Sequence, residues 1–189
     1  MFHTLRGPNR ARIAIAGLAL LAAFALSGCL KAEVRLDAAG GGTMTMEVSK
    51  LSREGYEDLR TKLSSPSVKV VDAAYADGVG RYEVKFTDVR KLRTAPLFSV
   101  IRVDHTGLDQ PRRTLEISIP RRVRQEKEPD LPPDDYVAAD LRVVFPGAVL
   151  ETTGTRAGDT TSSWQIRIVD LLGTGRIDNK TVYEVAAAQ

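Results

Sequence analysis

Hydrophobic and polar residues alternate along several stretches of this chain. Ala32, Val34 and Leu36 are separated by charged side chains, and the same period of two returns over residues 43–48. Alternation of this kind predicts half-buried strands, because successive side chains of a strand point to opposite faces of a sheet. Gly40-Gly41-Gly42 lies between the two stretches. We therefore expect them to form a β-hairpin.

The same period predicts a second hairpin and several later strands. Asp77-Gly78 is a favoured hairpin turn, and alternating segments lie on both sides of it. Asp104-His105-Thr106-Gly107 has the composition of a turn, so we interpret His105 as a turn residue. The remaining strand candidates are residues 97–103, 115–119, 141–145 and 164–168, with one short strand at 181–185.

One segment has helical periodicity instead. Tyr56, Leu59 and Leu63 recur at intervals of three and four residues, which places them on one face of a helix. Ser52 is a suitable N-cap, and Pro66 ends the pattern. This predicts a helix over residues 53–64.

Strands dominate, and clean alternation favours an antiparallel sheet with one buried face. We predict an α+β domain in which an antiparallel β-sheet built from hairpins is covered by one principal helix. A β-sandwich is the alternative. Met44 and Met46 share a face of one strand and are expected in the core, although methionine also suits a ligand pocket. Trp164 is expected to be a core residue.

The amino-terminal segment has the features of an export signal. Arg6, Arg10 and Arg12 precede an apolar run over residues 13–26, and small residues follow it. A basic region, a short hydrophobic region and small residues in this order are typical of a secretory signal. The apolar run is shorter than the ~20 residues that a spanning helix needs.

Leu26-Ser27-Gly28-Cys29 follows the apolar run and resembles the lipobox of bacterial lipoproteins. The resemblance implies that a signal peptidase recognises Leu26, Ser27 and Gly28 and that Cys29 receives a diacylglycerol. Residues 1–28 would then be the signal peptide, and residues 29–189 a single domain. Two acyl chains give stable anchoring, so we expect the protein in the cell envelope. It would lie on the outer side of the cytoplasmic membrane or in the outer membrane.

Net charge and the scarcity of cysteine and histidine argue against some classes of function. Removing the signal leaves 24 basic and 24 acidic side chains, so bulk charge does not favour nucleic acid as a partner. The only cysteine belongs to the anchor, and His105 is the only histidine beyond the signal. A nucleophilic triad therefore lacks obvious members, and no clustered ligands suggest a metal. We expect no catalytic residues, no metal and no cofactor.

A charged loop is predicted over residues 121–135, where prolines interrupt the alternation. The basic residues in and near it are candidates for contact with anionic lipid headgroups or with an acidic partner. A solvated strand end, balanced by the acids that follow, is the competing interpretation. These basic residues are Arg112, Arg113, Arg121, Arg122 and Arg124.

The order of these features is similar to that of the LppM-type lipoprotein domain of bacteria. The lipobox is followed by a hairpin, a helix and a second hairpin. Later come the run 141–147 ending in Pro146-Gly147, then Gly154, then Ser163-Trp164. The resemblance implies an α/β envelope domain that binds a lipid or glycolipid.

These observations favour a non-enzymatic domain, anchored to the membrane through acylated Cys29, that binds a lipid or other apolar ligand between sheet and helix. A structural or assembly module that binds another envelope protein, through the loop 121–135, is the alternative. An envelope hydrolase that uses carboxylates is a third.

Overall fold

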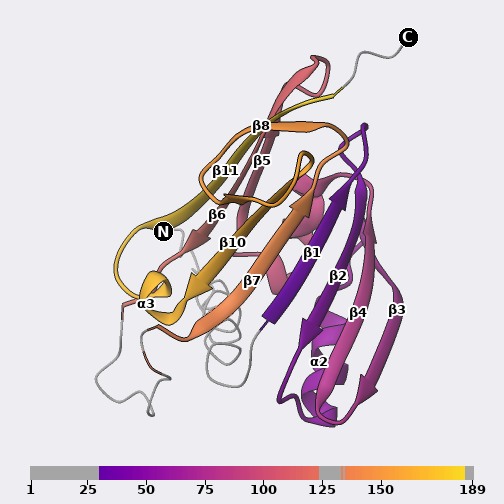
Figure 1. The fold of residues 1–189 in the computed structure, drawn as a ribbon. Helices are drawn as coiled ribbons and strands as arrows, with labels where there is room; N and C mark the ends of the chain where they lie inside the picture. The colour runs from indigo at the N-terminus through magenta and orange to yellow at the C-terminus, as the bar shows by residue number, and fades with distance from the viewer. Residues whose placement is uncertain (1–29, 124–132, 134, 186–189) are drawn as a thin grey trace, which may run out of the picture.

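The computed structural model describes residues 30–123, 133 and 135–185. The larger of its two sheets has seven strands in the order β3-β4-β2-β1-β7-β10-β9 (Figure 1). In chain order these are β1 (Leu30–Leu36), β2 (Gly42–Val48), β3 (Val68–Ala76), β4 (Val79–Phe86), β7 (Val137–Val144), β9 (Thr155–Arg156) and β10 (Thr161–Arg167).

Both predicted hairpins are confirmed within this sheet. β1 pairs antiparallel with β2, and β3 pairs antiparallel with β4. Asp77 and Gly78 have φ values of 51° and 74°. Positive φ at both central residues is characteristic of the type I′ turn, whose twist matches that of the flanking strands. β4 also pairs with β2, so the two hairpins form one continuous half of the sheet.

β1 joins this half to strands from much later in the chain. Its second neighbour is β7, which runs parallel to it, with Leu30 opposite Ala139 and Val34 opposite Val143. β10 then pairs antiparallel with β7. The expectation of a purely antiparallel sheet is wrong at the β1–β7 pairing. Alternation shows which residues face the core, but it carries no information about the direction of the neighbouring strand.

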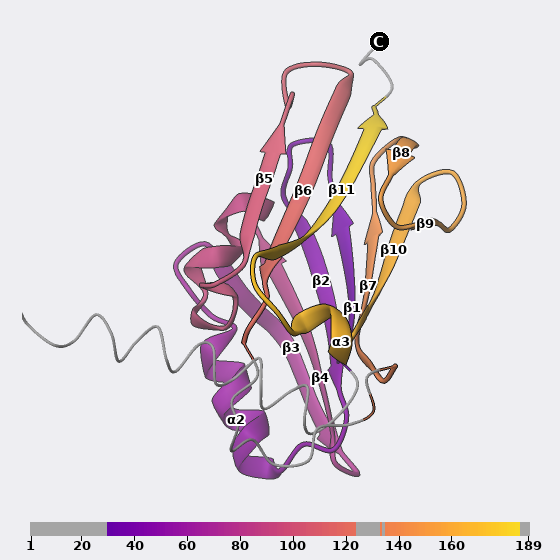
Figure 2. The same ribbon diagram turned by 90° about the vertical axis from the view of Figure 1, so that its left-hand side faces the viewer.

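A second, smaller sheet faces the first (Figure 2). Its order is β5-β6-β11-β8, and its strands are β5 (Arg102–Thr106), β6 (Arg112–Pro120), β8 (Ala148–Thr152) and β11 (Arg176–Glu184). Val84 and Val143 of the larger sheet share one core cluster with Leu115 and Tyr183 of the smaller sheet. Within the described residues, the two sheets therefore share one core.

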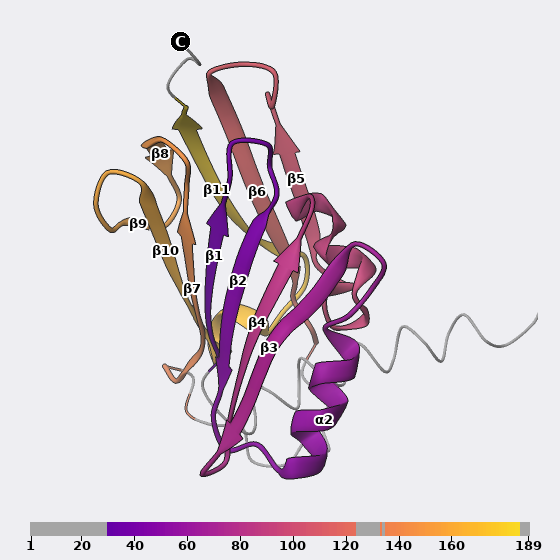
Figure 3. The same cartoon turned by 90° about the vertical axis from the view of Figure 1, so that its right-hand side faces the viewer.

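The fold is therefore mostly strand, with two sheets and few helices. Helix α2 (Arg53–Lys62) agrees with the predicted helix, and the Ser52 hydroxyl accepts a hydrogen bond from the Gly55 N–H at 3.0 Å. Tyr56 of α2 stacks on Tyr82, so α2 packs near β3 and β4 (Figure 3). It covers only this edge of the larger sheet. A single principal helix as the cover of the sheet is therefore not confirmed, since the smaller sheet also packs on the larger one.

The other helices are short. They are the 3₁₀ helices η1 (Val89–Thr94) and η2 (Pro96–Phe98), and α3 (Ile168–Leu171). None of the helices in the described part of the chain combines the length and apolar character that crossing a bilayer requires.

Two local predictions between residues 97 and 107 are wrong. η2 occupies the first part of the expected strand 97–103, because Pro96 has no N–H to donate and suits the start of a helical turn. β5 then continues through His105, so this residue lies in a strand and not in a turn. The turn begins only at Gly107, which has a φ of 75°.

Close packing between β11 and the β7–β8 connection generates a stability prediction. A Cβ added at Gly147 would lie 1.9 Å from the backbone oxygen of Glu184. Gly147→Ala must therefore displace the end of β11, and we expect it to lower the free energy of unfolding by about 1–3 kcal/mol. Chemical denaturation of residues 30–189 measures this loss. Exposed Ala148 is the matched control, and Ala148→Ser should change the value by less than about 0.5 kcal/mol.

Candidate functional site

An apolar cavity of about 130 Å³ lies between the two sheets. Both sheets contribute side chains to it. Further side chains come from η1, η2 and α3, and from Ile101, which lies between η2 and β5. Asp140 is the one charged residue in the described lining, and every other lining residue is apolar. The lining consists of Leu30, Ala32, Val34, Met44, Met46, Leu92, Phe98, Ile101, Val103, Ile117, Ile119, Ala138, Ala139, Asp140, Leu141, Ile166 and Leu171.

Small side chains on the larger sheet leave this space. Ala32 in β1 lies opposite both Met46 and Leu141. Ala139 in β7 lies opposite both Leu30 and Ile166. Protein cores are close-packed, so a void remains where alanine stands in a layer of larger residues and the neighbours do not collapse onto it. The cavity is thus a consequence of residue size at inward positions.

The volume limits what the cavity holds. An engineered apolar cavity of about 150 Å³ takes up benzene, so the present cavity accommodates a short hydrocarbon segment and not an entire lipid. Met44 and Met46 are two of its walls. Their unbranched side chains change shape easily, which allows a lining of this kind to adapt to a longer chain.

The cavity is not fully enclosed, since several residues of its lining are only half-buried. Val34, Met44 and Val103 in the lining are buried. Leu30 and Leu171 are only half-buried, and they mark the end where β1 begins and α3 lies (Figure 1). Leu30 directly follows Cys29, the expected lipid attachment residue. Cys29 itself, and Leu26, Ser27 and Gly28, lie outside the described residues.

A polar cleft of about 620 Å³ adjoins the cavity and shares Ile166 and Asp140 with it. Asn179 on β11 lines the cleft, is only 4% exposed, and its side-chain N–H₂ group has no hydrogen-bond partner. The indole N–H of Trp164 donates to the Thr153 hydroxyl at 3.2 Å beside it. A buried amide without a partner is costly, and this one lies beneath the wall of the cleft.

The predicted basic cluster is divided between two ends of a strand. Arg112 and Arg113 begin β6, whereas Arg121 and Arg122 follow its last residue, Pro120. Strand residues rise about 3.3 Å each, so the length of β6 separates the two pairs. Arg112 forms an ion pair with Glu151, and Arg113 donates to the backbone oxygen of Ala38. Arg121 and Arg122 lie instead beside α3, at the half-buried end of the cavity lining.

Most of the predicted charged loop lies outside the described residues, including Arg124. At its start, the N–H of Arg122 donates to the Leu171 oxygen, and the N–H of Gly173 donates to the Arg122 oxygen. The first residues of the loop are therefore attached to the segment at this end of the cavity.

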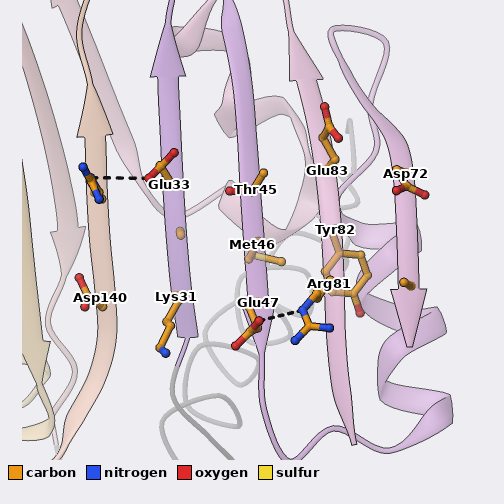
Figure 4. A pocket seen from close by; sticks show the side chains of 13 residues that line it. Lys31, Glu33, Thr45, Met46, Glu47, Asp72, Arg81, Tyr82, Glu83 and Asp140 are labelled. Carbon is orange, nitrogen blue, oxygen red and sulfur yellow. Dashed lines mark hydrogen bonds and ion pairs between the residues drawn. The ribbon is translucent and has the colours of Figure 1, made fainter. Parts of the chain in front are cut away.

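The outer face of the larger sheet is hollowed and charged (Figure 4). Ion pairs cross its strands: Arg81 pairs with Glu47 at 2.9 Å, and Arg142 pairs with Glu33 at 3.6 Å. Exposed ion pairs of this kind contribute little to stability. The period of two predicts that the charged residues between Ala32, Val34 and Leu36 point away from the core, and Glu33 on this face agrees with that prediction. Among the described residues, no three His, Cys, Asp or Glu side chains are grouped so that they could hold a metal ion.

The buried His105 side chain is the residue that the sequence interpretation placed most incorrectly. It is 2% exposed, and its Nε2 lies 2.7 Å from the Tyr183 hydroxyl. Its Nδ1 has no partner and faces Gly40, where an added Cβ would lie 3.3 Å away. Burial, reinforced by the nearby charge of Arg113, lowers the pKa of His105 from 6.5 to about 4. His105 follows buried Val103 by two residues, so extending the period of two beyond residue 103 could have identified His105 as an inward strand residue.

Sequence reasoning also missed part of the cavity lining. Phe98 belongs to η2, Ile101 lies between η2 and β5, and Leu171 belongs to α3, and these segments follow no strand period. Ala138 and Ala139 begin β7 ahead of the alternation that was recognised from residue 141.

A comparison with solved structures shows that the chain has an LppM-like fold. The NMR structure of the folded domain of Mycobacterium tuberculosis LppM matches with a TM-score of 0.54 and 15% sequence identity. The match covers 85% of this chain and 92% of the LppM chain. No family model matches the chain, and no curated protein sequence does.

The buried histidine makes stability depend on pH. Between pH 6.5 and about 4, His105 is protonated in the unfolded chain but neutral in the folded one. Unfolding therefore takes up a proton, and the free energy of unfolding should fall as the pH falls through this window. The slope should approach about 1.4 kcal/mol per pH unit. Urea denaturation at several pH values measures it.

Two variants isolate the effect of His105. His105→Phe removes the titrating group and should flatten the slope in this window. Tyr183→Phe removes the hydrogen bond to the ring but should keep the slope. Asp88 and Asp170 have lowered pKa values, so they lose their stabilising charge only below about pH 3.8. An unchanged slope in His105→Phe would contradict this assignment.

Proposed function

We propose that this protein is a lipid-anchored protein of the cell envelope whose domain binds a lipid or another apolar ligand between its two sheets. The observation that carries the proposal is the cavity, whose described lining is apolar except for Asp140. Each buried CH₂ group contributes about 0.8 kcal/mol, so a few methylene groups in the cavity give useful affinity. The cavity lies between the sheets, and no residue of α2 lines it, in contrast to the expected position between sheet and helix.

The adjoining cleft supports a ligand with a polar part. Ile166 and Asp140 separate the apolar cavity from a cleft that contains the unpartnered amide of Asn179. A molecule with a hydrocarbon segment in the cavity and a polar group in the cleft would satisfy both environments. Fatty acids and acylated compounds have this chemistry, and the fold similarity to LppM is compatible with it.

We propose binding and not catalysis as the role of the domain. His105 has the one imidazole of the described residues. It is hydrogen-bonded to Tyr183 in the core and is not among the residues that line the cavity. Burial keeps it neutral and inaccessible, which is unsuitable for a general base that must reach a substrate.

Filling the cavity tests the binding proposal. Ala139→Leu places a larger side chain in the lining, and we expect uptake of a fluorescent fatty acid by residues 30–189 to fall at least tenfold. Ala74→Leu is the matched control, because Ala74 is exposed on the outer face of the same sheet, and it should leave uptake unchanged. Native mass spectrometry of the unsubstituted protein should show a bound lipid. Absence of both co-purified lipid and fatty-acid uptake would remove the proposal.

The anchor is tested separately. Cys29→Ser cannot form a thioether, so the full chain should lose its diacylglycerol mass and remain uncleaved or move to the soluble fraction. Membrane fractionation and intact-mass measurement check this in a bacterial host. Unchanged mass and fractionation in Cys29→Ser would contradict lipid attachment at this residue.

A further inference from the structure

We propose that the contact between His105 and the turn of residues 37–41 is an acid-sensitive clasp between the two sheets. Protonation of His105 frees the turn from the smaller sheet and loosens the cavity where its lining is buried. The turn joins β1 to β2 in the larger sheet, whereas His105 lies in β5 of the smaller sheet. The effect on the cavity rests on the proposed function, but the release of the turn does not, so the two are measured separately.

Two hydrogen bonds attach this turn to the described residues outside its own hairpin. The backbone oxygen of Gly40 accepts the Val89 N–H at 2.8 Å, and Arg113 donates to the backbone oxygen of Ala38. Residues 37–39 are exposed. An exposed turn with so few attachments can open locally while the strands behind it stay paired.

The His105 ring packs against the turn with one nitrogen unpartnered. A Cβ added at Gly40 would lie 3.3 Å from Nδ1 and 3.2 Å from the Leu108 side chain. Nε2 lies 2.7 Å from the Tyr183 hydroxyl, but Nδ1 has no hydrogen-bond partner. An imidazolium carries a proton on both nitrogens. Protonation therefore places a charged N–H group in the core, against Gly40, where the described residues provide no acceptor.

The charges around the ring do not compensate for this. Arg113 of β6 and Arg90 of η1 repel a positive charge on the ring, whereas Asp88 attracts it. The Asp88 carboxylate is already bound to the Arg90 guanidinium at 2.7 Å. Asp37, the one acid of the turn, accepts two backbone N–H groups of the turn itself. Both carboxylates are thus engaged, and moving the turn away from the ring is the route by which protonated His105 reaches water.

The clasp lies beside the buried part of the cavity lining. Val103 lines the cavity and precedes His105 by two residues on the same face of β5. Val34 and Met44 lie opposite each other in β1 and β2, line the cavity, and are each three residues from the turn. The β1–β2 and β5–β6 turns lie at the same end of the molecule (Figure 3). Release of the turn therefore loosens these three walls, and a bound hydrocarbon segment loses packing contacts.

Native-state hydrogen exchange tests the clasp without any ligand. The protein used is residues 30–189, which contains both sheets and the described core. With pKa values for His105 of 6.5 when open and about 4 when closed, the opening constant of the Val89 amide should rise between pH 7 and pH 4.5. After correction for intrinsic exchange, the rise should be on the order of 50-fold. Dilute urea should not change it, because local opening exposes little surface.

The other hairpin turn provides a matched reporter. The Leu51 N–H donates to the Gly78 oxygen at 2.7 Å, at the opposite end of the larger sheet. This loop amide also opens locally, and its opening constant should change less than about twofold. An equal rise at Leu51, a urea-dependent rise at Val89, or no rise at Val89 would overturn the clasp.

Two variants assign the effect to the imidazole. His105→Phe has no titrating group, so the opening constant of Val89 should become independent of pH. Asp104→Asn removes an acid from the adjacent position of β5 and should keep the full rise. His105 is the one histidine of residues 30–189, so NMR titration of its ring in the unsubstituted protein is a second measurement. A ring that titrates without any change in Val89 exchange would also overturn the clasp.

A probe without an ionisable group measures the effect on the cavity. The dissociation rate of a pyrene-labelled fatty alcohol should rise between pH 7 and pH 4.5 in parallel with the opening constant of Val89. It should stay constant in His105→Phe. A constant rate in the unsubstituted protein would overturn the coupling of the clasp to the cavity. Failure of the probe to bind at pH 7 would instead remove the proposed function, while exchange at Val89 still decides on the clasp.

Discussion

Burial of two apolar sheet faces against each other is the interaction on which the rest of this structure depends. Neither sheet would be stable alone in water, because each would expose a row of large apolar side chains. Val84 and Val143 belong to this row in the larger sheet, and Leu115 belongs to it in the smaller sheet. The described residues contain no cysteine that could reinforce this contact. The candidate site is a gap in this contact between the sheets. Alanines stand there in place of larger residues, so the two layers do not pack closely and a cavity remains.

Much of the secondary structure could be predicted from the sequence, and the reasons are local. A period of two identifies inward and outward positions of a strand, Asp77-Gly78 has the backbone freedom of a tight turn, and Ser52 caps a helix with its own hydroxyl. The packing of the smaller sheet on the larger one could not be predicted in the same way. Alternation shows that one face is covered but leaves the covering element unspecified, and it does not reveal that β1 lies beside β7.

The candidate site was less accessible to prediction than the fold. Its lining comes from segments far apart in the chain, and its volume depends on Ala32 and Ala139 lying at diagonally adjacent inward positions of the paired strands β1 and β7. His105 shows a related difficulty. Asp104, Thr106 and Gly107 favour a turn by composition, yet the buried neighbours of His105 across the sheet keep the chain extended as far as Gly107. Tertiary packing overrides local preference at such positions.

The parallel pairing of β1 with β7 has a consequence for how the protein matures. A chain that is synthesised from its amino-terminus can form its two early hairpins at once, but one edge of the central strand stays unpaired until residues 137–144 are made. Pairing between such distant segments is slow, and an open strand edge invites association with other chains. The order of synthesis thus creates an interval in which the partly folded chain is vulnerable to aggregation through the free edge of β1.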